Sequence, residues 1–161
     1  MMPLRPTQTA ADEAAFVERF ARLLEREGGP RIAGRIAALL LLTPEALSLE
    51  EIARRLKASK ASVSTNARLL EQWGLLERIG RPGDRRDFYR ANPQGAVNLL
   101  ERRLEWMRRL GAVAAEGARS QAAQHPVVRE RLRALSRLQA FALRNTERAL
   151  RQVRGAGRAR A

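Results

Sequence analysis

The sequence predicts a mainly α-helical fold, in which a winged helix-turn-helix with a small β-hairpin wing is joined to long terminal dimerisation helices. Two observations predict it. Between residues 47 and 90 a helix, a turn, a second helix and two strand-like runs follow one another. Outside this stretch, amphipathic segments of helical period occupy most of the chain. Of the 161 residues, 45% are hydrophobic and only 4% aromatic, so the core must be mainly Leu, Ala, Val and Ile.

Two helices precede the winged stretch. Residues 1–11 contain two prolines and show no periodicity, and we expect a flexible N-terminal arm there. An amphipathic helix is predicted over residues 12–27, and Gly28-Gly29-Pro30 ends it. The next helix, residues 31–42, has a proline at its start, which suits helix initiation. Gly34 within it indicates a close approach to another helix.

Caps mark the next two helices. Ser48 is expected to cap a helix over residues 49–56, with Glu51 at the third helical position as in a capping box. Residues 57–58 then form a tight turn. A second helix runs from its cap at Ser59 to Trp73, because a glycine follows.

A hairpin completes the winged stretch. Residues 75–79 and 87–90 are predicted as its strands, and residues 81–85 as the turn between them. Residues 46–48 can add a short third strand to the same sheet.

The second helix of such a motif enters the major groove of DNA. With Val63 at the centre of the buried face, Ala67 and Leu70 fall beside it at 100° per residue. The opposite face is short and polar near its start and has one long cation further along, which suits contact with bases or phosphates. The predicted DNA-binding residues here are Ser59, Lys60, Ala61, Ser62, Ser64, Thr65 and Arg68. The alternative is an ordinary solvated helix face.

Arginines crowd the predicted wing. Arg78, Arg81, Arg85 and Arg86 lie there with only Asp84 and Asp87 as nearby acids, and we predict that they reach phosphates or a minor groove. Arg81, Arg85 and Arg86 in particular are expected to have no internal partner. Upstream, Arg31 and Arg35 lie one helical turn apart, where they either pair with acids or lie against the DNA backbone.

The C-terminal third predicts a dimer. A long helix starts near residue 93, and its apolar positions alternate three and four residues apart: Val97, Leu100, Leu104, Met107, Leu110 and Val113. After a break at His125-Pro126, a last helix over residues 127–153 has a second apolar set. A winged helix needs only about three helices to cover its sheet. The remaining helices would leave their apolar faces exposed in a monomer. A symmetric homodimer built from the terminal helices would bury those faces, and the alternative is a hairpin folded back on its own subunit.

The run SKASVSTNARLLEQWGLLERIGRPGDRRDFY, residues 59–89, resembles the DNA-binding core of the MarR superfamily, and most of all its GbsR-type branch. GPRIAGRI, residues 29–36, is similar to the same branch. The resemblance implies a transcriptional regulator that pairs through its terminal helices. Thr65 is a departure, since many MarR-type recognition helices have Arg at that position, so their base contacts do not transfer directly.

Some GbsR-type proteins respond to choline-like cations, and aromatic cages bind such groups. By that resemblance an effector would be held by Trp73, Phe88, Tyr89 and Trp106, which in the alternative interpretation are ordinary core residues.

The charge and the composition of the chain exclude several classes of function. The net charge of +14 implies a polyanionic partner, either nucleic acid or an acidic membrane surface. The longest apolar run, residues 36–42, is far short of the roughly 20 needed to span a membrane. There is no cysteine, no phosphate-binding loop, no visible signal peptide and only one histidine, His125. We therefore expect a cytoplasmic, nucleoid-associated protein that is not an enzyme and uses no cofactor or metal.

Together these features predict a sequence-specific DNA-binding regulator. The expected form is a dimeric repressor on a pseudo-palindromic operator, relieved by a small-molecule effector. The alternatives are a nucleoid-type protein that coats DNA without sequence preference, and a winged helix used only to bind other proteins. The expected parts are an arm (1–11), a helix plus DNA-binding domain (12–92), a helical dimerisation region (93–154) and a disordered basic tail (155–161).

Overall fold

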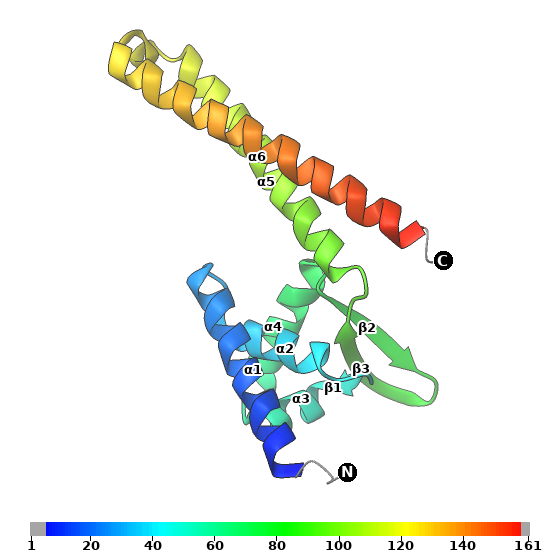
Figure 1. Ribbon diagram of the computed structural model, residues 1–161. Coiled ribbons are helices and arrows are strands. Elements are labelled where there is room, and N and C mark those ends of the chain that lie inside the picture. Colours follow the sequence, from blue (N-terminus) through cyan, green and yellow to red (C-terminus); the bar gives the residue numbers. More distant parts are fainter. Residues whose placement is uncertain (1–5, 159–161) are drawn as a thin grey trace. The chain divides into compact units, whose positions relative to one another are not determined.

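A computed structural model describes the backbone of residues 6–158 and the side chains of residues 10–154 (Figure 1). The chain forms two compact units, Met1–Gly95 and Ala96–Ala161. The fold is mainly helical, with one small antiparallel sheet, which confirms the predicted fold class. No helix in the described range is both long and apolar enough to cross a membrane.

Within residues 6–95, the first unit contains four helices and three strands. The helices are α1 (Pro6–Arg26), α2 (Arg31–Leu41), α3 (Leu49–Leu56) and α4 (Lys60–Gln72). The strands are β1 (Leu47–Ser48), β2 (Leu76–Arg81) and β3 (Asp84–Ala91), in the sheet order β1-β3-β2. The short third strand is therefore present, and it pairs Leu47 with Tyr89.

Helix α1 starts six residues before the predicted position. Residues 6–11 were expected to belong to a flexible arm, but they are helical from Pro6 onward. The physical reason is that proline suits the first turn of a helix, where its missing N–H costs nothing. Residues 1–5 of the predicted arm lie outside the described residues.

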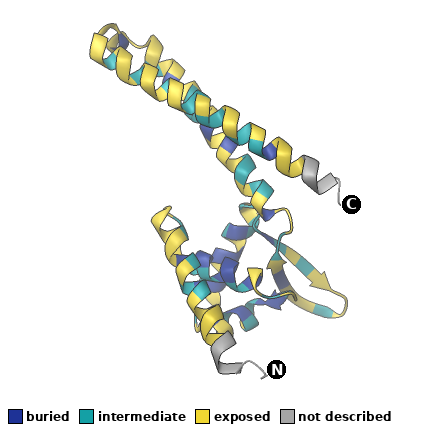
Figure 2. Cartoon of the chain, in the orientation of Figure 1, coloured by how far each residue is buried: buried dark blue, intermediate teal, exposed yellow. Residues whose placement is uncertain are grey.

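The core of the first unit lies between its helices and one face of the sheet. Figure 2 shows buried residues concentrated in α2 and α4. They include Ile36 and Leu40 of α2 and Val63 and Leu70 of α4, and Ile52 of α3 belongs to the same core. The predicted close approach at Gly34 is confirmed. A Cβ atom added there would lie 2.7 Å from the Cα of Ala21 on α1, so a larger residue would push α1 and α2 apart.

The capping box of α3 is present as predicted. The Ser48 Oγ accepts from the Glu51 amide at 3.3 Å, and the Ser48 amide donates to Glu51 Oε2 at 2.7 Å. The Ser48 hydroxyl also donates to that carboxylate at 2.8 Å, and these hydrogen bonds lower the pKa of Glu51. At the next helix, Ser59 Oγ accepts from the Ser62 amide at 3.2 Å.

The wing has a tighter turn than the predicted interval of residues 81–85. Arg81 and Asp84 are paired across the strands, which leaves Pro82 and Gly83 as the two turn residues. Gly83 has a φ of 79°, and proline followed by a glycine of positive φ is typical of a type II turn. The strands therefore extend further than predicted, with an irregularity in register between Ile79 and Arg81.

The second unit is a helical hairpin. It consists of α5 (Gly95–Arg119), a short 3-10 turn η1 (Gln121–Gln124) and α6 (Pro126–Arg158). Met107 accepts a hydrogen bond at its carbonyl from Gln139 Nε2, 2.9 Å away, which joins the two long helices. The helix continues through residues 155–158, which were predicted to belong to a disordered tail. Two of these four residues are glycines and disfavour helix, so the continuation comes from the long helix before them, because extending an existing helix is easier than starting one. Residues 159–161 lie outside the described range.

Within the hairpin, the predicted apolar positions of α5 are buried unequally. Leu104 and Met107 are buried, but Val113 is 62% exposed and Ala114 is buried in its place. From Met107 to Leu110 and Val113 the predicted positions advance by three residues twice, and each such step turns only 300°, so the series rotates off the buried face. Ala114, seven residues after Met107, stays on that face. Gly111 lies on the buried side, where an added Cβ would come within 2.8 Å of the Gln139 side chain.

Candidate nucleic-acid interface

Helix α4 presents the predicted face to solvent. Its buried side consists of Val63, Asn66, Ala67 and Leu70, in agreement with the predicted orientation. Ser59, Lys60, Ala61, Thr65 and Arg68 are exposed, and Ser62 and Ser64 are half-buried. The seven predicted DNA-binding residues of this helix therefore lie on or beside its solvent side.

Two of the serines and the lysine already have local roles. Ser59 caps the helix, and the carbonyl of Ser62 accepts a hydrogen bond from Asn66 Nδ2 at 2.8 Å. Lys60 forms an ion pair with Glu50 of α3, which lowers the pKa of that carboxyl. This contact joins the two helices of the helix-turn-helix at their exposed side.

Arg68 and Thr65 are the side chains best placed to meet a ligand. Arg68 Nη2 donates to Ser64 Oγ one turn earlier at 2.9 Å, so its guanidinium lies along the helix surface. Guanidinium groups bind guanine or phosphate, and hydroxyl groups bind either bases or phosphates.

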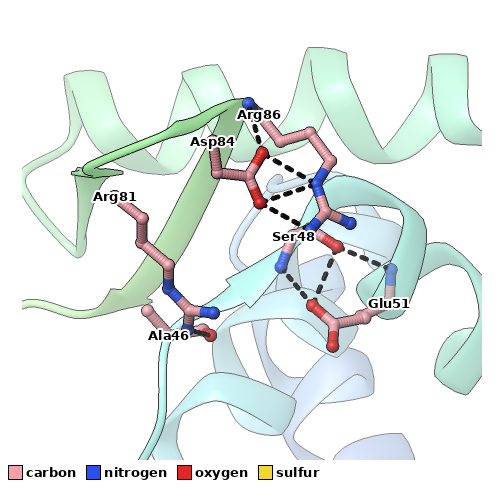
Figure 3. Close-up of polar contacts among 6 residues, drawn as sticks. All are labelled: Ala46, Ser48, Glu51, Arg81, Asp84 and Arg86. Atoms are coloured by element: carbon pink, nitrogen blue, oxygen red, sulfur yellow. Dashed lines mark hydrogen bonds and ion pairs between the residues drawn. The ribbon is translucent and has the colours of Figure 1, made fainter.

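The wing arginines differ from the expectation that they lack internal partners. Figure 3 shows that Arg86 contacts the Asp84 carboxylate and that Arg81 contacts the Ala46 carbonyl. The Arg86 Nη2 donates to Asp84 Oδ2 at 2.6 Å, and the Arg81 Nη2 donates to the Ala46 oxygen at 2.9 Å. Asp84 and Arg86 are two residues apart on β3 and share one face of the sheet. This pairing lowers the pKa of Asp84 to about 2.

Arg78 and Arg85 complete the wing. Arg78 lies 3.7 Å from a carboxylate oxygen of Glu71 and 3.5 Å from one of Asp87. Arg85 is exposed, and within the described part of the chain its side chain makes no hydrogen bond, ion pair or ring contact. The expectation of a cation without an internal partner therefore holds for Arg85 and is wrong for Arg81 and Arg86.

The buried Phe88 ring contacts the guanidinium groups of two wing arginines. Phe88 is 1% exposed, with the guanidinium carbon of Arg81 3.8 Å from the ring centroid and that of Arg86 at 5.3 Å. Stacking of guanidinium groups on an aromatic face is favourable by roughly 0.5–2 kcal/mol for each pair. This stacking of two arginines on Phe88 was not predicted from the sequence, because it depends on which face of β3 each side chain occupies.

The four aromatic residues proposed as an effector cage lie in different environments. Phe88 and Tyr89 are neighbours on β3, so they point to opposite faces of the sheet, and both are buried. Tyr89 belongs to the main core, where burial raises its pKa, and Trp73 packs against the same core. Trp106 of the second unit is 55% exposed, beneath the guanidinium of Arg103.

The two upstream arginines pair with an acid. Arg31 Nη2 donates to Glu18 Oε2 at 2.8 Å, and Arg35 Nε lies 2.8 Å from Glu18 Oε1. The hydrogen bond from Arg31, together with the charge of Arg35, lowers the pKa of the Glu18 carboxyl. Of the two interpretations left open by the sequence, this geometry favours the internal one.

Three comparisons with known proteins agree with this geometry. Residues 28–87 match the sequence model of the MarR family. The chain is 37% identical over 131 residues to the HTH-type transcriptional regulator MmpR5 of Mycobacterium tuberculosis, covering 81% of this chain and 79% of that protein. The crystal structure of a transcriptional regulator superposes with a TM-score of 0.77 at 34% identity, covering 89% of this chain and 99% of that one.

Proposed function

This chain belongs to the MarR family of winged-helix, DNA-binding transcriptional regulators, and we propose that it acts as a dimeric repressor on a pseudo-palindromic operator. The observation that carries the proposal is the division of α4 into two faces. Val63, Ala67 and Leu70 are buried, whereas Thr65 and Arg68 are exposed. In this proposal Thr65 and Arg68 contact bases or nearby phosphates, and the wing contacts the flanking backbone.

The exposed apolar surface of the second unit supports the dimer. Leu99, Trp106 and Val113 lie seven residues apart on one face of α5, and each is more than half exposed. On α6, Leu138 and Phe141 are 66% and 59% exposed. Large apolar side chains grouped on a surface mark association sites, and a second copy of this chain would cover them.

We further propose a small-molecule effector and membership of the GbsR-type branch, which the run of residues 29–36 supports. A cavity of about 460 Å³ lies between α1, α2 and α3, and its lining includes Val17, Glu18, Arg35 and Leu56. Its volume falls within the range of small-molecule sites. Such an effector would release the operator by shifting the spacing of the two recognition helices.

The competing function is a nucleoid-type protein that coats DNA by charge alone, which the net charge of +14 favours. Selection of duplexes from a random library with the wild-type protein separates the two. At physiological salt, a regulator should bind the selected duplex at least about 10³-fold more tightly than a scrambled one. Equal affinity for both duplexes would contradict the proposed function.

Arg68→Ala tests the recognition face with the same two duplexes. We expect binding to the selected duplex to weaken by about 1–3 kcal/mol, as for the loss of a good base contact, with little change on the scrambled one. Arg144→Ala, which removes an exposed arginine of α6, is the matched control and should change neither. If Arg68→Ala leaves both affinities unchanged, α4 does not present this face to DNA.

A further inference from the structure

One side chain connects three helices beside the turn of the helix-turn-helix. Arg35 on α2 donates from Nη2 to the carbonyl of Leu56, the last residue of α3, at 2.9 Å. Its Nε lies 2.8 Å from Glu18 of α1 in an ion pair whose N–H is not aimed at the oxygen. The Arg35 side chain is 27% exposed, against 51% for Arg31, so its guanidinium is held within the unit.

The Leu56 carbonyl is a group that the helix end leaves without a partner. The Ala58 amide donates to the Ala53 carbonyl at 3.0 Å, and the Lys57 amide donates to the Arg54 carbonyl at 3.3 Å. These two bonds form a Schellman motif, which uses the carbonyls of residues 53 and 54. The guanidinium of Arg35 satisfies the carbonyl at residue 56, and a cation at a helix C-terminus is also favoured by the helix dipole.

The turn that follows is short and conformationally costly. Lys57 has a φ of 50°, a left-handed conformation that residues other than glycine rarely adopt. Only Ala58 separates it from Ser59, the cap of α4. Because so few residues join α3 to α4, the direction of the peptide at Leu56 determines the direction in which α4 starts.

We propose that Arg35 is a positioning residue for DNA recognition. It bonds the Leu56 carbonyl while Glu18 holds its guanidinium, and it thereby sets the angle at which α4 meets the major groove. The inference rests on the proposed function for its effect on DNA, but its effect on the turn can be measured without DNA. Arg35 also lines the cavity between α1, α2 and α3, so this contact is where a bound effector would reach the recognition helix.

Amide hydrogen exchange of the full chain tests the contact directly. In Arg35→Met we expect the Lys57 and Ala58 amides to exchange about tenfold faster or more, relative to the amides of Val63 and Ala67. Arg31→Met is the matched control, because it removes the other guanidinium on Glu18 and leaves Leu56 untouched. Unchanged exchange at Lys57 and Ala58 in Arg35→Met would overturn the proposal.

DNA binding tests the consequence. On a duplex selected by the wild-type protein, Arg35→Met should bind about tenfold more weakly, with unchanged affinity for a scrambled duplex and an unchanged salt slope. An equal loss on both duplexes, with a flatter salt slope, would mean that Arg35 contacts phosphate and would overturn the positioning role. If the wild-type protein selects no sequence, the proposed function fails, while the exchange measurement still decides whether Arg35 holds the turn.

Arg35→Lys keeps the test decisive if the methionine variant does not fold. Lysine retains the charge beside Glu18 but lacks the planar fork that reaches two partners at once. We expect faster exchange at Lys57 and Ala58 and weaker binding to the selected duplex, both smaller in size than for methionine. Wild-type behaviour of Arg35→Lys in both measurements would overturn the proposal.

Discussion

At the scale of single residues, neighbouring arginines of one hairpin have different capacities to bind an external anion. Arg86 already neutralises Asp84, and Arg81 is held by the Ala46 carbonyl and the Phe88 ring. Arg85 carries a charge with no such contact among the residues that the structure describes. A phosphate would therefore displace nothing at Arg85, whereas at Arg86 it would compete with an existing ion pair.

We accordingly expect Arg85→Ala to flatten the slope of log affinity against log salt by about two units for a dimer, since each phosphate contact contributes about 0.9. Affinity for selected and scrambled duplexes should fall together in a salt titration, and Arg144→Ala should leave both slopes unchanged. A loss confined to duplexes with A·T-rich flanks would instead indicate that Arg85 enters a minor groove. No change on any duplex would show that the wing does not touch DNA through this residue.

At the scale of elements, the two helix caps of the helix-turn-helix differ in burial and in the number of hydrogen bonds they make. Ser48 is fully buried and exchanges three hydrogen bonds with Glu51, while Ser59 is exposed and accepts one. Ser48 also belongs to β1, so it joins the first helix of the motif to the wing sheet. Loss of its hydroxyl would leave the half-buried Glu51 carboxylate with one donor fewer.

Ser48→Ala should therefore lower the free energy of unfolding by about 1–2 kcal/mol. Ser59→Ala, the matched control at an exposed cap, should cost about 0.5–1 kcal/mol. Urea unfolding of the full chain, followed by the fluorescence of Trp73 in the first unit and checked in a Trp106→Phe background, measures both. Equal losses for the two variants would show that burial adds nothing to the Ser48 cap.

At the scale of the whole molecule, the two units have different proposed roles: the first binds DNA and the second forms the dimer. The first unit has its own core and the second presents large exposed apolar side chains. We expect Leu138→Glu combined with Phe141→Glu to convert a dimer into a monomer, because carboxylates cannot be buried at an apolar contact without a large cost. Sedimentation equilibrium measures the mass, and Arg144→Glu adds a carboxylate at another exposed position of α6 as control.

A dimer that persists in the double variant would place the contact elsewhere. In the monomer, we expect affinity for the selected duplex to fall towards that for a single half-site, because bivalent binding is lost. Affinity for a duplex containing one half-site should stay unchanged, which distinguishes the loss of pairing from damage to the first unit.

Local signals explain why the helix-turn-helix could be predicted closely. The Ser48 and Glu51 pair, the Ser59 cap and the period of Val63, Ala67 and Leu70 all act within a few residues. The partners of the wing arginines depend on strand register and on contacts with Ala46, far away in the sequence. The same holds for Arg35, since its spacing from Arg31 does not show that it reaches Leu56 across the fold.

The separation of the two faces of α4 has a consequence for how such regulators diverge in evolution. The side chains that support the fold, among them Val63 and Leu70, are not those proposed to meet DNA, among them Thr65 and Arg68. Substitutions on the exposed face remove no buried contact and cost little stability. A duplicated gene can therefore explore new operators at these positions while its product stays folded, so that related regulators acquire separate targets on an unchanged scaffold.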